Sequence, residues 1–73
     1  MKNIMIIGGH TAVVAYVPET GMFRGEFVDL NGGAEFYAAG VSGLRNEGEL
    51  SLEVFLEECS RRNIPSQKQF SGN

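Results

Sequence analysis

Residues 11–38, TAVVAYVPETGMFRGEFVDLNGGAEFYA, decide the fold, because they hold three runs rich in β-branched and aromatic residues separated by two turn sequences. The first run, 11–17, leads into Pro18-Glu19-Thr20-Gly21, where proline sets φ and glycine accepts a positive φ. The returning run covers 22–30, and Asn31-Gly32-Gly33 separates it from the third run at 34–38. The pattern predicts an antiparallel sheet of three to four strands.

The alternation of side chains along these runs predicts which residues face the core. Phe23, Gly25 and Phe27 share one face of the second strand, and Phe36 lies on the inward side of the third. The residues between them point the other way, toward solvent or a partner: Arg24, Glu26, Glu35 and Tyr37.

Residues 3–7, ahead of Gly8-Gly9, allow two interpretations: a short separate strand, or the bulged beginning of the first long one. Their apolar run, 4–7, is too short for a signal-peptide core and far too short to span a bilayer. We therefore expect no export or membrane signal, and a cytoplasmic protein.

From Val41 the apolar spacing changes from the period of a strand to that of a helix, which predicts an amphipathic helix to about Asn63, stopped by Pro65. Gly48 in its interior costs ~1 kcal/mol relative to alanine, and close approach to an aromatic residue of the sheet explains it. The expected core face comprises Val41, Leu44, Gly48, Ser51, Leu52, Phe55, Leu56 and Cys59.

Leu50 and Val54 form an apolar pair one helical turn apart on the side away from this core face. Such a pair would waste apolar surface in a monomer, so we interpret it as a self-association contact. A chain of 73 residues buries only roughly 60% of its unfolded surface. Both observations predict a homo-oligomer.

The expected fold class is therefore α+β, with one helix packed on one face of the antiparallel sheet, in a single domain covering residues 1–73. Phe70, in the polar segment after the helix, is a candidate for a last short strand at the sheet edge. The predicted order is β-β-β-α-β.

Composition restricts the partners and the chemistry. Six Lys and Arg against nine Asp and Glu give a formal charge of -3, which repels nucleic acid and attracts a basic partner. The single cysteine, Cys59, cannot form an internal disulfide, and with one histidine it cannot build a structural zinc site. We expect Cys59 to be a buried small hydrophobe, and we expect no metal and no cofactor.

His10 is the sole candidate general base, and no second acid, nucleophile or ligand set lies near it in sequence. We interpret it as a partly exposed imidazole at a strand end. The ten glycines contain no GxGxxG or GxxxxGK[ST] motif, so they are turn residues and not a phosphate cradle. We therefore predict no catalytic residues.

The whole chain resembles the N-terminal domain of HicB-family antitoxins. Residues 8–33, GGHTAVVAYVPETGMFRGEFVDLNGG, match the family's Gly-Tyr-Thr-Ala strand, acidic turn and Phe-x-Gly strand. The resemblance continues through AEFYAAGVSGL (34–44) and LRNEGELSLEVFLEECSRRNIP (44–65) to KQFSGN (68–73). Two positions depart from the family: His10 replaces a usual tyrosine, and Gly48 often corresponds to a larger apolar residue.

The resemblance implies a domain similar to a degraded RNase H fold that has lost its catalytic acids. It also implies a function: such domains bind HicA, a small basic mRNA-cleaving toxin with its own catalytic histidine, and cover its active site. Family members usually continue into a DNA-binding domain, whereas this sequence stops at Asn73. We expect that C-terminal domain to be absent, through truncation, a shortened gene, or a variant that neutralises without repressing.

For the surface that meets the toxin we single out a row on the sheet with one residue near its edge: Arg24, Glu26, Asp29, Glu35, Tyr37 and Phe70. The plain alternative for the row is an ordinary solvated face, although an amphipathic tyrosine among charges of both signs suits a binding surface. Two other functions stay open: a stand-alone oligomeric scaffold or ligand-binding module of the same fold, and a ribonuclease that uses His10.

Overall fold

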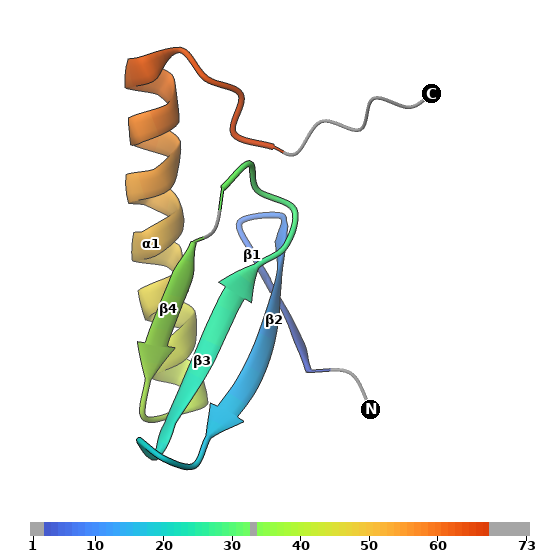
Figure 1. Ribbon diagram of the computed structural model, residues 1–73, viewed down its shortest axis with the longest axis vertical. Coiled ribbons are helices and arrows are strands. Elements are labelled where there is room, and N and C mark those ends of the chain that lie inside the picture. The colour runs from blue at the N-terminus through green and yellow to red at the C-terminus, as the bar shows by residue number, and fades with distance from the viewer. Residues whose placement is uncertain (1–2, 33, 68–73) are drawn as a thin grey trace.

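The computed structural model describes residues 3–32 and 34–67, and shows an α+β fold (Figure 1). Four antiparallel strands lie in the order β1-β2-β3-β4, and one helix covers one face of the sheet. The elements are β1 (Ile4–Ile7), β2 (His10–Val17), β3 (Met22–Phe27), β4 (Glu35–Ala38) and α1 (Val41–Arg62). The predicted fold class is confirmed.

The first hairpin settles the two interpretations of the N-terminal residues, because β1 is a separate strand. Gly8 and Gly9 connect it to β2 with φ values of 56° and 81°, and Ile7 pairs with His10 across the turn. Two successive positive φ values define the tight hairpin turn that matches the twist of the flanking strands, and glycine adopts them without strain.

The second hairpin turns at residues 18–21, as predicted, and pairs Val17 with Met22 and Ala12 with Phe27. β3 then ends at Phe27, three residues earlier than the predicted run. Leu30 instead forms an isolated bridge with Gln67, so the chain after the helix returns beside the end of β3. Residues 68–73, including Phe70 and the strand predicted there, lie outside the described residues.

The core lies between the sheet and α1. No polar or charged residue of the described chain is buried, so apolar contacts alone fill this layer. The three largest fully buried side chains come from a strand, a loop and the helix: Ile7, Leu30 and Leu44.

Phe36, the second residue of β4, is held between two glycines. Gly25 is its neighbour on β3, and a Cβ placed there would overlap the ring, with Phe36 Cδ2 only 3.0 Å away. Gly48 of α1 approaches from the other side, where a Cβ would lie 2.9 Å from Phe36 Cε2 and would also overlap Ile7. The predicted approach of Gly48 to an aromatic residue is confirmed.

The buried line of α1 is narrower than the predicted core face. It comprises Leu44, Gly48, Leu52 and Cys59. Val41 is 57% exposed and Leu56 is 37% exposed, so their predicted burial was wrong. Val41 is the first residue of the helix and Leu56 lies at the margin of the buried line, so the sheet covers neither. Within the described chain no helix is long and apolar enough to cross a membrane.

The close packing around Phe36 predicts that a glycine-to-alanine substitution has opposite effects on stability at two sites of α1. Gly48→Ala should destabilise the fold by about 1–3 kcal/mol, because the added methyl forces the ring and Ile7 apart. Gly43→Ala meets only the Ala38 Cβ at an ordinary 3.5 Å, and should stabilise by about 0.5–1 kcal/mol through helix propensity. Urea unfolding of both variants measures this, and stabilisation by Gly48→Ala would contradict it.

Candidate binding surface

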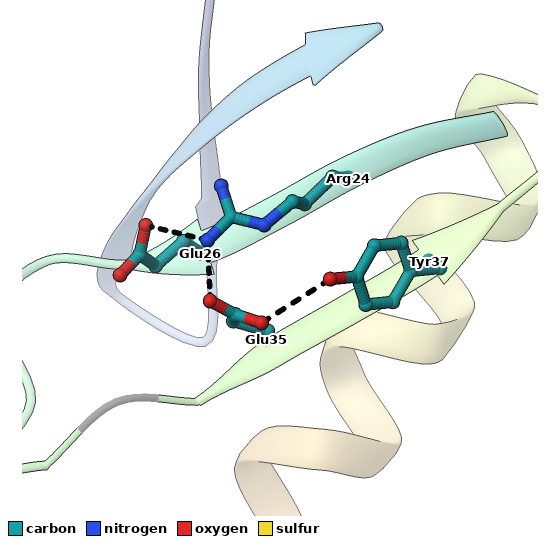
Figure 2. Close-up of polar contacts among 4 residues, drawn as sticks. All are labelled: Arg24, Glu26, Glu35 and Tyr37. Carbon is teal, nitrogen blue, oxygen red and sulfur yellow. Dashed lines mark hydrogen bonds and ion pairs between the residues drawn. The ribbon is translucent and has the colours of Figure 1, made fainter. Parts of the chain in front are cut away.

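Four of the predicted surface residues gather on the outer face of the sheet, away from α1 (Figure 2). Arg24 and Glu26 come from β3, and Glu35 and Tyr37 come from β4. The strand register places Arg24 opposite Tyr37 and Glu26 opposite Glu35. We call these four residues the sheet cluster.

Hydrogen bonds fix the geometry of the sheet cluster. The Arg24 guanidinium donates through Nη2 to Glu35 Oε2 and, at 3.2 Å, to Glu26 Oε1. The Tyr37 hydroxyl donates to the other oxygen of Glu35, Oε1, at 3.2 Å. Glu26 and Glu35 face each other across the strands, which would be repulsive alone, and the shared arginine offsets that repulsion.

The hydrogen bond from Arg24 holds the pKa of Glu35 below its ordinary value, against the opposing effect of desolvation, and the same bond raises the pKa of Arg24. Because the folded pKa of Glu35 is lowered, the pair stabilises the fold at neutral pH. That contribution is lost as the pH falls from the ordinary range of glutamate through the lowered pKa. The ion pair of Arg24 and Glu35 thus persists to lower pH than an isolated glutamate would allow.

An apolar area adjoins the sheet cluster, and sequence reasoning missed it. Ile4 pairs with Val13 across β1 and β2, and Val13 in turn pairs with Glu26 of the cluster. Ile4, Ile6, Val13 and Val28 are all exposed large hydrophobic residues. The alternation along 4–7, 11–17 and 22–30 contained the signal, since these four residues are out of phase with the buried residues of the strands. A hydrophobic area with a polar border is the usual composition of a protein interface.

Asp29 does not join the sheet cluster, contrary to the expectation for the partner face. Its Oδ2 accepts the backbone N–H of Thr11 at 3.2 Å and lies 3.4 Å from His10 Nδ1. The antiparallel register of β2 and β3 explains this position. Ala12 pairs with Phe27, so His10, two residues before Ala12, lies opposite Asp29, two residues after Phe27. The second acid that seemed absent near His10 is therefore 19 residues away in sequence and adjacent in space.

The pair of His10 and Asp29 is two groups and not a larger site. Both His10 Nδ1 and Asp29 Oδ1 are buried without a hydrogen-bond partner, and the imidazole packs edge-on against Phe27 at 6.5 Å between ring centroids. Among residues 3–32 and 34–67 no group of three or more His, Cys, Asp or Glu side chains could hold a metal ion. The hydrogen bond from the Thr11 N–H to Asp29 ties the start of β2 to the chain after β3.

The predicted self-association residues lie close to the sheet cluster. Leu50 and Val54 are exposed on α1, and with Glu47 they form one wall of an open hollow of about 520 Å³. Glu35 and Tyr37 of β4 form the other wall. The two sets of residues therefore meet at one edge of the molecule. Phe70, the sixth residue predicted for the partner face, lies outside the described residues.

Comparison with known proteins leaves the function to be inferred from this surface. No protein-family model, no curated protein and no solved structure matches the chain. The resemblance to HicB antitoxins stays a prediction from the residues quoted above.

Asp29 should matter for stability. Asp29→Ala leaves the Thr11 N–H without its acceptor and should lower the free energy of unfolding by about 1–2 kcal/mol. Asp29→Asn retains an oxygen at the same place and should lose less, and Glu26→Ala, on the exposed cluster, should change stability little. Equal losses in all three variants would refute a structural role for Asp29.

Arg24 should control the protonation of Glu35. In Arg24→Gln the pKa of Glu35 should rise toward its ordinary value, because the charge-assisted hydrogen bond is lost. Carboxyl-detected NMR titration measures this, with Arg62→Gln, at the exposed end of α1, as the matched control. A Glu35 pKa that is the same in Arg24→Gln and in the unmodified chain would contradict the assignment.

Proposed function

We propose that the chain is a non-catalytic binding protein of the antitoxin type, which covers the active site of a small basic mRNA-cleaving toxin of the HicA kind. One observation carries the proposal: the outer sheet face presents a hydrogen-bonded cluster of Tyr37 and three charged residues beside exposed apolar side chains. Other residues form the buried core, and the side chains of this outer face do not contribute to it.

Charge supports a basic partner. The chain carries a formal charge of -3, and the sheet cluster contains two carboxylates and one guanidinium. Opposite charge raises the rate of encounter and rejects acidic competitors. Arg24 occupies only one oxygen of Glu26, so the other remains available to a lysine or arginine of the toxin.

The Tyr37 side chain is already ordered in the free chain, which lowers the entropic cost of binding a partner. Tyr37 is 46% exposed, yet its hydroxyl is already fixed by Glu35. A rigid, amphipathic aromatic residue is the type that most often supplies binding energy in an interface, and a side chain fixed before binding loses less entropy. The apolar neighbour Val13 extends the contact toward β1.

A ligand-binding module is the alternative, and a second hollow favours it. This hollow, of about 330 Å³, lies between the first strands and the start of α1 and has mostly apolar walls. Tyr16, Phe23 and Val41 contribute to it. Its volume is at the lower end of the range for small-molecule sites.

The test of the antitoxin function mixes the purified chain with a purified HicA-type toxin and measures RNA cleavage. A reading frame beside this gene that encodes a short basic protein with a lone histidine would supply that toxin. We expect loss of cleavage at an equimolar ratio. Tyr37→Ala should weaken inhibition about thirtyfold, the effect of losing about 2 kcal/mol of contact. Tyr16→Ala is the matched control, since Tyr16 is 54% exposed and lies on the opposite face; it should inhibit normally.

Other outcomes decide between the alternatives. Unchanged cleavage together with no complex on a sizing column would remove the antitoxin function. A small molecule that binds the unmodified chain but not Tyr16→Ala would establish the ligand-binding module. RNA cleavage by the chain alone, abolished in His10→Ala, would establish a ribonuclease instead.

A further inference from the structure

A second line of residues runs along α1, separate from its buried line. It comprises Glu47, Leu50, Val54, Glu58 and Arg61, at successive spacings of 3, 4, 4 and 3 residues. These spacings keep the five side chains on one face of a helix. We call this line the helix stripe. Its spacing is the same read from either end, with Val54 at the centre.

The apolar centre of the helix stripe is uncovered in a single chain. Leu50 is 57% exposed and Val54 is 65% exposed. Surface hollows lie on both sides of Val54: the one of about 520 Å³ toward Glu47, and another of about 440 Å³ formed with Glu57, Glu58 and Arg61. Side chains of a neighbouring helix could fill both hollows.

We propose that two copies of the chain pack antiparallel through the helix stripe, with the two-fold axis at Val54. The palindromic spacing then places Val54 against its own counterpart and Leu50 against the aliphatic stem of Glu58 of the second copy. Glu47 meets Arg61 of the second copy at both ends. The contact is self-complementary, as two-fold symmetry requires.

Charge selects this orientation. A parallel pairing would place Glu47 beside Glu47 and Arg61 beside Arg61, and like charges in contact are strongly disfavoured. Glu58 does not oppose the antiparallel pairing, because its two oxygens already accept from Arg61 and, at 2.7 Å, from Arg62 Nε. Leu50 therefore meets a neutralised carboxylate.

The same charges distinguish a second copy from the basic partner of the outer sheet face. A uniformly basic protein would suit Glu47 but would be repelled by Arg61 and Arg62 at the other end of the stripe. A second, antiparallel copy places its Arg61 beside Glu47 and its Glu47 beside Arg61, so opposite charges meet at both ends of the stripe. This pairing uses residues of α1, and it borders the sheet cluster at the hollow that Glu35 and Tyr37 also line. It does not depend on the proposed antitoxin function and can be tested on the isolated chain.

Cysteine cross-linking locates the two-fold axis. Val54→Cys should form a covalent dimer in mild oxidant, because the two thiols meet on the axis. Val41→Cys is the matched control, at another exposed valine of the same helix. It should stay monomeric, as should the unmodified chain, whose Cys59 is buried. Equal cross-linking in both variants, or none in Val54→Cys, would overturn the proposal.

Charge reversal tests the antiparallel register. In sedimentation equilibrium, Glu47→Arg and Arg61→Glu should each raise the dimer dissociation constant about tenfold, since each creates two like-charge contacts. The double variant Glu47→Arg/Arg61→Glu should restore the original constant. Failure of the double variant to restore dimerisation, while both single variants remain folded by circular dichroism, would overturn the register.

The oligomeric state of the unmodified chain provides the last test of the dimer. If it remains monomeric up to about 1 mM, the association is weaker than about 4 kcal/mol and the proposal is wrong. If Val54→Glu reduces inhibition of a HicA-type toxin without changing the mass of the free chain, the stripe is occupied by that basic protein and the dimer proposal is wrong.

Discussion

The ring of Phe36, held between Gly25 and Gly48, is the contact on which the arrangement of the molecule depends. Because Gly25 and Gly48 have no side chains, the aromatic ring fits between them and α1 can approach β3 and β4 closely. Since the buried residues of that narrow layer are apolar and no polar residue of the described chain is buried, the charged residues of β3 and β4 lie on the outer face. The position of the candidate binding surface is thus a consequence of how the core is packed.

Much of this could be predicted from the sequence, because it follows from local periodicity. Alternation placed Phe36 inward and Glu35 outward, and the helical spacing indicated why Gly48 is small. The pair of His10 and Asp29 was missed because it depends on register between two strands, which short-range patterns do not specify. Short-range patterns also failed to predict the exposure of Val41, because it depends on where the sheet ends beneath the helix.

The chain presents two surfaces on different elements. The outer face of the sheet has fixed charges, a prearranged Tyr37 and apolar neighbours, which together suit a basic protein. The exposed face of α1 carries both signs of charge in an order that suits its own copy. The two surfaces meet at the hollow beside β4, where Glu35 and Tyr37 lie across from Leu50 and Val54, so the proposed dimer contact borders the sheet cluster.

NMR of the labelled chain tests most directly the central claim, that the Phe36 ring sits between the two glycines. The ring should shift the Hα resonances of Gly25 and Gly48 upfield, and nuclear Overhauser contacts should join both residues to the Phe36 ring protons. Ordinary glycine shifts, without contacts from Phe36 to either residue, would contradict the packing of helix on sheet and with it the assignment of the outer face.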